Sequence, residues 1–236
     1  MHPVLIFRHS PTEGPGYFAT FLDRHAIPWK LVRIDAGEAV PSSLNGVSGV
    51  CLMGGPMSVN DDLPWIPPLL ALIRAAVERD IPVIGHCLGG QLMAKALGGT
   101  VGANPMKEIG WADLRVTDVD AARPWVGEAS GPLPGFHWHG ETFSLPPGAT
   151  RILDSALCAN QAYVLNGRHI GMQCHVEMTP ELVTSWCDVG AAEIAASDSP
   201  GVQPPEMIQA DLTARTARLH QLADKIYSRW IQGLRE

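Results

Sequence analysis

Short apolar runs alternate with amphipathic stretches through the first part of the chain, and this alternation is the sequence feature that most limits the possible fold. Several apolar runs have the length of buried strands, at 4–7, 31–34, 49–53 and 81–84. Other stretches carry apolar residues at helical spacing, at 17–25, 67–79 and 88–97. Strands and helices that alternate in this way predict an α/β fold, with a parallel sheet covered by helices on both faces.

The second half of the chain is less regular. Residues 111–117 are a predicted strand, whereas residues 118–135 are rich in proline, glycine and charge and are predicted to form a surface excursion. The dipeptide Asn166-Gly167 lies between two apolar runs and predicts a β-hairpin.

The end of the chain is predicted to be an appendage to the main domain. Residues 197–205, with the sequence SDSPGVQPP, indicate a linker. Apolar residues from Ile208 to Trp230 then recur at helical spacing, which predicts a terminal helix that packs on the domain. We therefore expect one domain at 1–190, followed at 191–236 by the linker and the C-terminal helix.

Composition excludes several classes of protein. The 236 residues include 24 acidic and 17 basic side chains, which give a formal charge of −7, and no basic block suits a nucleic-acid binder. No apolar stretch reaches the roughly 18 residues that a membrane-spanning helix needs. The five cysteines are odd in number and widely spaced, which indicates free thiols in a reducing compartment. Since the first residues also lack a signal-peptide pattern, we expect a cytoplasmic protein without nucleic-acid or membrane partners.

The sharpest local feature is the segment that joins the predicted strand at 81–84 to the predicted helix at 88–97. Gly85 and Gly89 flank Cys87, and glycine lets the backbone bend sharply there without a clashing Cβ. A strand, a tight turn and a helix with this pattern are typical of a nucleophile elbow. Cys87 would lie at the helix N-terminus, whose partial positive charge stabilises an anion, and is the candidate nucleophile.

A cysteine nucleophile needs a base and a group that orients the base. In an extended strand, residues i and i+2 share a face, so His175 and Glu177 can point the same way. Glu177 could then hold the imidazole in one tautomer and stabilise the imidazolium. Cys174, one residue away, should face the opposite side.

The segment Gly54-Gly55-Pro56 follows another predicted strand, at the sheet edge where ligands bind in open parallel sheets. A glycine there can offer an unobstructed N–H. Together with the N–H of Leu88, it would form an oxyanion hole for a tetrahedral acyl intermediate.

These three segments together resemble the class I (triad) glutamine amidotransferases. In that family the nucleophile lies in G-x-C-x-G-x-Q, which Cys87 and Gln91 match together with the flanking glycines. The oxyanion glycine lies in a G-G-P loop, matched around Gly55. The base and its orienting group lie in Q-F-H-P-E, matched by Gln173, His175 and Glu177. Three motifs in the right order are more specific than any one of them alone.

The resemblance also implies the fold and the substrate contacts. The expected fold is a flavodoxin-like three-layer sandwich with a mostly parallel central sheet and the elbow after a central strand. The family's H-G-D segment is similar to His139-Gly140-Glu141 here. This similarity implies that the substrate amino acid is held by Gln91, Trp138, His139 and Gly140.

The chain departs from the family pattern at two positions, and it resembles one branch of the family in particular. Val176 replaces a proline, and Glu141 replaces an aspartate. The sequence around the motifs is similar to that of stand-alone family members, which resemble the glutaminase part of GMP synthase. Residues 191–236 are too few for an ATP-binding synthase domain, so we expect any acceptor or synthase to be a separate protein.

The implied activity is cysteine-dependent hydrolysis of the side-chain amide of glutamine, through a γ-glutamyl thioester. A first alternative is a γ-glutamyl peptidase that acts on glutathione-like conjugates with the same residues. A second alternative is a non-catalytic regulatory subunit, against which the retention of Cys87, His175 and Glu177 argues.

A metal or nucleotide site is not expected. His137 and His139 would share a face of a strand, as zinc ligands can, but no partner at metal-ligand spacing accompanies them. Residues 12–16 (TEGPG) lack the lysine and the glycine spacing of a phosphate-binding loop. The sequence therefore predicts no metal and no cofactor.

Overall fold

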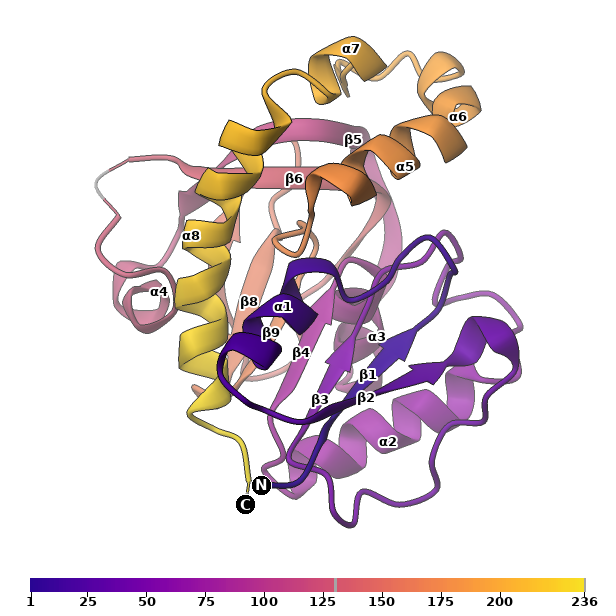
Figure 1. Ribbon diagram of the computed structural model, residues 1–236, viewed down its shortest axis with the longest axis vertical. Coiled ribbons are helices and arrows are strands. Elements are labelled where there is room, and N and C mark those ends of the chain that lie inside the picture. Colours follow the sequence, from indigo (N-terminus) through magenta and orange to yellow (C-terminus); the bar gives the residue numbers. More distant parts are fainter. Residues whose placement is uncertain (130, 236) are drawn as a thin grey trace.

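A computed structural model describes residues 1–129 and 131–235 of the chain (Figure 1). The strands are β1 Val4–Arg8, β2 Trp29–Arg33, β3 Gly49–Leu52, β4 Val83–His86, β5 Val101–Val116, β6 Leu133–Phe143, β7 Thr150–Asp154, β8 Ala162–Leu165, β9 His169–Met172 and β10 Gly201–Val202. The helices are α1 Gly16–Arg24, α2 Ile66–Glu78, α3 Leu88–Ala96, α4 Val119–Val126, α5 Pro180–Val189, α6 Ala191–Ala195, α7 Pro205–Ile208 and α8 Leu212–Ile231, with a short 3-10 turn, η1, at Ile34–Ala36.

The strands form one sheet in the order β10-β5-β7-β8-β9-β4-β3-β1-β2, with β6 paired to β5 beside this path. The run from β9 through β4, β3 and β1 to β2 is parallel. The pairs from β9 through β8 and β7 to β5 and β6 are antiparallel. The carboxyl ends of β1, β3 and β4 therefore meet at one edge, and the segments that follow these strands lie near one another.

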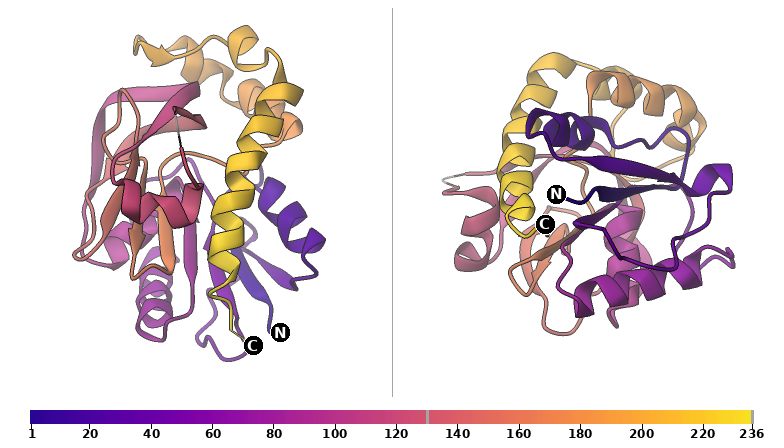
Figure 2. Two further views of the ribbon diagram at one scale, coloured as in Figure 1. Left: turned by 90° about the vertical axis from the view of Figure 1, so that its left-hand side faces the viewer. Right: turned by 60° about the horizontal axis from the view of Figure 1, so that its bottom comes forward.

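Helices cover both faces of the parallel strands, as the alternation predicts. Along β1, Val4 and Ile6 belong to one buried apolar cluster, whereas Leu5 and Phe7 belong to the other. The first cluster also takes in residues of α1 and α8, and the second takes in residues of α2 and α3. Figure 2 shows α1 and α8 on one side of the sheet and α2 and α3 on the other. Strands buried on both faces need apolar side chains at every position, which explains their continuous apolar runs.

Two expectations for the second half are wrong. Residues 118–135 are not only a surface excursion, because α4 forms within them and buries Ala122, Trp125 and Val126. Asp118 caps this helix by accepting a hydrogen bond from the N–H of Ala121 at 3.0 Å. Ser130 in the same segment lies outside the described residues.

The segment at 197–205 is also more than a linker. It contains β10, which pairs in parallel with β5, and Ser199 Oγ donates a hydrogen bond to the carbonyl of Lys107 at 2.6 Å. These bonds tie the segment to the sheet.

The C-terminal helix α8 lies against the helical layer that contains α1. Tyr227 is buried, and its hydroxyl lies 3.1 Å from Nε2 of His86, at the end of β4. Tyr17 in α1 donates a hydrogen bond to Asp224 at 2.8 Å. We propose that the main domain ends at residue 190 and that residues 191–236 form an appendage to it. None of the helices in the described residues is both long enough and apolar enough to cross a membrane.

The variant Gly85→Ala is expected to destabilise the fold, because a Cβ at this position would overlap the backbone of Gly89 and Gly90. Backbone atoms cannot swing aside, so we expect the free energy of unfolding to fall by about 2 kcal/mol or more. Gly102→Ala is the matched control, since nothing lies within 4 Å of its Cβ position. Urea unfolding followed by circular dichroism measures both variants, and equal stabilities would contradict the close packing of the turn.

Candidate active site

The turn between β4 and α3 has the geometry of a nucleophile elbow. Cys87 adopts φ +49° and ψ −108°, a conformation that side chains other than glycine rarely take. Its N–H donates to the carbonyl of Met172 at 2.8 Å, and its own carbonyl accepts from Gln91 N–H at 3.0 Å. The turn is therefore fixed by hydrogen bonds to β9 on one side and to α3 on the other.

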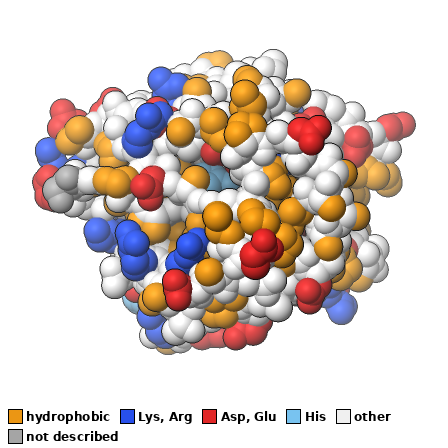
Figure 3. All heavy atoms as spheres, turned by 90° about the horizontal axis from the view of Figure 1, so that it is seen from above, with side chains coloured by type: hydrophobic (Ala, Val, Ile, Leu, Met, Phe, Trp, Pro, Cys, Tyr) orange, Lys and Arg blue, Asp and Glu red, His pale blue; other side chains and the backbone are white. Residues whose placement is uncertain are grey.

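The Cys87 thiol lines a cavity of about 590 Å³ at the carboxyl edge of the sheet. Cys87 as a whole residue is 7% exposed. Its Sγ accepts from Gln173 Nε2 at 3.4 Å and lies 3.7 Å from the carbonyl oxygen of Trp138. Figure 3, which views the molecule from above Figure 1, shows histidine atoms in a hollow near the centre of this face.

His175 and Glu177 also lie at this edge, joined by a hydrogen bond of 2.7 Å between Nδ1 and Oε1. The prediction that these two residues lie in an extended strand is wrong, because the backbone there is irregular. Strand β9 ends at Met172, and His175 is held by a single bridge, in which its N–H donates to the carbonyl of Phe136 at 2.8 Å. The two side chains nevertheless meet, and His175 lines the same cavity as Cys87.

The electrostatics of this pair favour an imidazolium next to a carboxylate. Burial raises the pKa of Glu177, but the charges of His175 and His86 outweigh it and bring the pKa to about 2. Burial likewise lowers the pKa of His175, but the opposing effects of Glu177 and Cys87 raise it well above its usual value. A proton transferred from Cys87 to His175 would therefore give an imidazolium that the charge of Glu177 stabilises.

The candidate oxyanion residues lie close together. A Cβ at Gly55 would lie 2.7 Å from the Leu88 side chain, 2.6 Å from Met57 Sδ and 3.2 Å from His9, so a larger residue at this position would have to displace these side chains. Leu88 is the first residue of α3, where backbone N–H groups have no partner within the helix. Gly55 lines the cavity, and the Leu88 amide directly follows Cys87.

The predicted substrate contacts line the cavity as well; they are Gln91, Trp138, His139 and Gly140. Gln91 Nε2 donates to Gln173 Oε1 at 3.1 Å, which fixes its amide group in one orientation. Trp138 Nε1 donates to Glu193 at 2.9 Å. The structure therefore brings every predicted site residue to one edge of the sheet, while their roles stay predictions.

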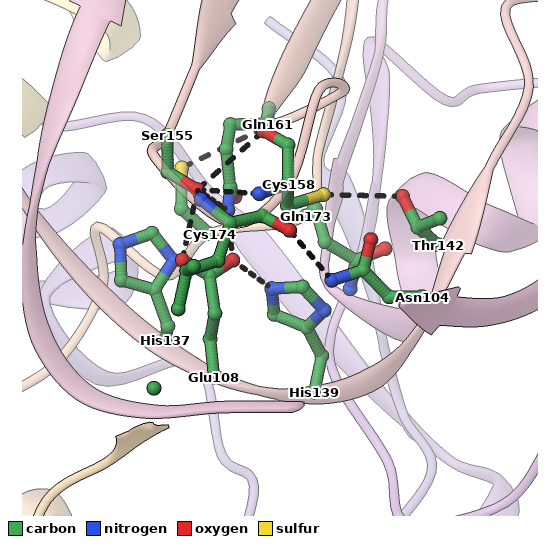
Figure 4. A network of polar contacts seen from close by, with 12 residues as sticks. Asn104, Glu108, His137, His139, Thr142, Ser155, Cys158, Gln161, Gln173 and Cys174 are labelled. Carbon is green, nitrogen blue, oxygen red and sulfur yellow. Dashed lines mark hydrogen bonds and ion pairs between the residues drawn. The ribbon is translucent and has the colours of Figure 1, made fainter. Parts of the chain in front are cut away.

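A buried polar network supports the strand that carries these contacts (Figure 4). The carboxylate of Glu108 in β5 accepts hydrogen bonds from Ser155 at 2.8 Å and from Gln161 at 2.7 Å. It also pairs with His139 Nε2 at 3.0 Å. This network joins β5 and β6 to the turn that follows β7, so its hydrogen bonds hold the ring of His139 in place.

The same network contains a group whose geometry could suit a metal ion. Ligand atoms of Glu108, His137 and His139 lie within 4.8 Å of one another. Both carboxylate oxygens of Glu108 are already engaged in hydrogen bonds with the protein. Burial lowers the pKa of His137 to about 4, so this histidine is neutral. A set of satisfied hydrogen bonds accounts for Glu108 and His139 without an ion.

Sequence reasoning missed several residues that line the cavity: Glu13, Lys107, Trp186 and Glu193. Gln173 was matched as part of a motif but not as a partner of the thiol. The segment around Glu13 was considered only as a phosphate loop. Trp186 lies in α5, and its ring packs edge-on against His175 at 4.9 Å between centroids. No local pattern marks these residues, because the tertiary fold alone brings them to the cavity.

Iodoacetamide is expected to modify Cys87 and to spare the other four cysteines in the folded protein. Those four are at most 2% exposed, and burial raises the pKa of each of their thiols; they are Cys51, Cys158, Cys174 and Cys187. Intact mass should show one adduct, peptide mapping should locate it, and Cys87→Ala should show none. Modification of Cys174 before Cys87 would contradict this assignment.

Comparison with known proteins points to one family. The family described as glutamine amidotransferase class-I matches residues 22–185. The glutamine amidotransferase-like protein YfeJ of Salmonella typhimurium is 28% identical over 224 residues, which cover 93% of this chain and 92% of the relative. The glutamine-hydrolyzing GMP synthase of Paraburkholderia phytofirmans is 33% identical over 139 residues, which cover 56% of this chain but only 25% of that relative.

Solved structures agree with this comparison. A glutamine amido transferase from Methylobacillus flagellatus is 48% identical, with a TM-score of 0.97 over 100% of this chain and 96% of that one. A glutamine amidotransferase from Thermotoga maritima is 27% identical, with a TM-score of 0.87 over 98% and 99% of the two chains. These likenesses confirm the predicted α/β fold with its mostly parallel central sheet.

Proposed function

Because the chain belongs to the class I glutamine amidotransferase family, we propose that it hydrolyses γ-glutamyl amides through a thioester on Cys87. The observation that carries this proposal is the 2.7 Å pair of His175 and Glu177, in which the imidazole of His175 lines the same cavity as the elbow cysteine. A thiol, a base and a group that orients the base are the minimum that covalent acyl transfer requires.

The first half of the reaction forms the thioester. His175 takes the proton of the Cys87 thiol, and the sulfur attacks the side-chain carbonyl carbon of the substrate. The N–H groups of Gly55 and Leu88 stabilise the oxyanion of the tetrahedral intermediate. His175 then gives its proton to the leaving nitrogen as the carbon–nitrogen bond breaks.

The second half releases the product. His175 takes a proton from a water molecule, the oxygen attacks the thioester carbonyl, and the proton returns to the Cys87 sulfur as the carbon–sulfur bond breaks. The products are a γ-carboxylate and a free amine, which are glutamate and ammonia when the substrate is glutamine. Glu177 stays ionised throughout, because the pKa of its carboxyl is held at about 2.

Two substrate classes share this chemistry. The first is free glutamine, with the ammonia passed to a separate synthase as acceptor protein. The second is a γ-glutamyl peptide or other γ-glutamyl amide, for which a cavity of about 590 Å³ has room. The reacting groups support an enzyme over a non-catalytic subunit in either case.

Glutamate release from glutamine and from a panel of γ-glutamyl amides is expected in the wild-type protein and should be abolished in Cys87→Ala. Glu177→Ala should retain more activity, with kcat about 10³–10⁴-fold below wild type, because it loses orientation and imidazolium stabilisation but keeps the nucleophile. The glutamine-based electrophile diazo-oxo-norleucine should add mass to the peptide that contains Cys87.

Cys187→Ala is the control for this experiment, since Cys187 is buried in α5 and does not line the cavity. Circular dichroism should give the same spectrum for all variants. Turnover by Cys87→Ala at the wild-type rate would contradict the proposed mechanism.

A further inference from the structure

Gln173 is a buried amide that contacts the sulfur of Cys87, and the proposed mechanism gives it no role. Its side-chain Nε2 donates a hydrogen bond to Cys87 Sγ at 3.4 Å, and the residue has no exposed surface. Its backbone N–H donates to the carbonyl of Gln161 at 2.8 Å. The preceding residue, Met172, accepts a hydrogen bond from the N–H of Cys87 at 2.8 Å. Two consecutive residues therefore hold the backbone and the sulfur of the candidate nucleophile.

The polar contacts of the sulfur differ in the charge state that they favour. Cys87 Sγ lies 3.7 Å from the carbonyl oxygen of Trp138. A carbonyl oxygen can only accept, so this contact is a hydrogen bond only while the sulfur carries its proton. The amide N–H of Gln173 is a donor, and a hydrogen bond to a charged acceptor is about twice as strong as one to a neutral acceptor. Gln173 therefore favours the thiolate, whereas the Trp138 carbonyl favours the thiol.

The action of Gln173 on the sulfur differs from that of His175. In the proposed mechanism His175 takes the proton of the thiol and later returns it. A side-chain amide does not gain or lose a proton in this way, so Gln173 can donate at every stage. It would stabilise the sulfur anion before the attack, and again when the carbon–sulfur bond of the thioester breaks.

Gln91 fixes the orientation of the Gln173 amide. Gln91 Nε2 donates to Gln173 Oε1 at 3.1 Å, so the oxygen of Gln173 faces Gln91 and its nitrogen faces the sulfur. With the amide reversed, the N–H groups of the two glutamines would face each other, and an oxygen would face the sulfur. Gln91 is itself held to the elbow, because its backbone N–H donates to the carbonyl of Cys87 at 3.0 Å. The two amides and the thiol therefore form one chain of hydrogen bonds that begins and ends at the elbow.

We propose that Gln173 is a catalytic residue that stabilises the sulfur anion of Cys87, and that Gln91 holds its amide in the donating orientation. When the S–H bond of Cys87 breaks, the proton goes to His175. The electron pair left on the sulfur accepts the hydrogen bond from Gln173 until it forms the bond to the γ-carbonyl carbon. This inference rests on the proposed function and adds a residue to its site.

Alkylation of Cys87 by iodoacetamide tests this role without turnover, because the thiolate is the form that reacts. Gln173→Met keeps the length of the side chain and removes the N–H. At neutral pH we expect its alkylation rate to be about tenfold below wild type, with the pH profile moved to higher pH by about one unit. At high pH the two rates should converge, because the thiol is ionised in both proteins. A merely structural role would instead lower the rate at every pH.

Two further variants test the chain and the specificity of the change. Gln91→Met should move the profile in the same direction by less, because the Gln173 amide remains and only its orientation is lost. The double variant should behave as Gln173→Met alone, because both residues act through one hydrogen bond. Gln221→Met makes the same change on an exposed residue of α8 and should leave the profile unchanged.

The titratable groups around the thiol are the same in all these variants, so differences between their profiles report the amides. Glu177 is bonded to His175, and the titratable residues that line the cavity with Cys87 are Glu13, Lys107, His139, Glu141, His175 and Glu193.

Turnover should show the same loss. For glutamine or a γ-glutamyl amide, Gln173→Met is expected to lower kcat/KM about tenfold. The loss should lie in kcat, with KM changed less than about threefold, because Gln173 contacts the sulfur and is not among the residues that line the cavity.

Nuclear magnetic resonance of the wild-type protein gives a readout that does not depend on the folding of a Gln173 variant. The side-chain N–H signals of Gln173 should shift with pH in step with the ultraviolet absorbance of the thiolate. In Cys87→Ala this shift should be lost, because the acceptor is gone.

An unchanged alkylation profile in folded Gln173→Met would overturn the assignment, as would a rate that is lowered equally at every pH. Gln173 signals that do not follow the ionisation of the thiol would overturn it as well. Absence of glutamate release by wild type, with the shift of the alkylation profile intact, would instead refute the proposed function alone.

Discussion

The close approach of the first turn of α3 to the sheet is the constraint on which the site depends. Added Cβ atoms at Gly85, Gly89 and Gly90 would collide with backbone of α3 itself, of Leu52 in β3 and of Met172 in β9. This contact presses the helix N-terminus against three parallel strands and forces the positive φ of Cys87. Because the packing over-determines the turn, the thiol is held at the sheet edge before any ligand arrives.

A second constraint places the imidazole. His175 follows the end of β9, and a bridge to Phe136, the bond to Glu177 and the edge of Trp186 together hold it in place. Neither a strand nor a helix holds it, so its position is set by contacts from β6, α5 and its own segment. The first turn of α1 also helps to fix the segment, since the N–H of Tyr17 donates a hydrogen bond to the carbonyl of Glu177. The base therefore depends on the correct assembly of the whole carboxyl edge.

Sequence reasoning succeeded where the physical cause was local. The elbow follows from glycine spacing around Cys87, and the parallel sheet follows from runs that are apolar at every position. It failed where the cause was tertiary: α4 was missed because Pro124 and several charges obscured a helix that needs only one apolar face, with Trp125 buried. The pair of His175 and Glu177 was found through strand periodicity, although the backbone there is irregular. Glu13 gave no signal because a single glutamate in a glycine-rich loop has no pattern.

The two carboxylates beside His175 differ in a way that separates their roles. Glu177 is bonded to Nδ1 and shares the buried environment of His86, so its charge is fixed whether or not the cavity is filled. Glu13 lines the cavity together with His175, and burial raises its pKa to about 7, so its charge depends on what the cavity holds. Ionisation of Glu13 would add a second negative charge to the surroundings of the imidazole and favour the imidazolium that forms when Cys87 attacks. The protonation state of one cavity carboxylate would thus be coupled to the activation of the nucleophile.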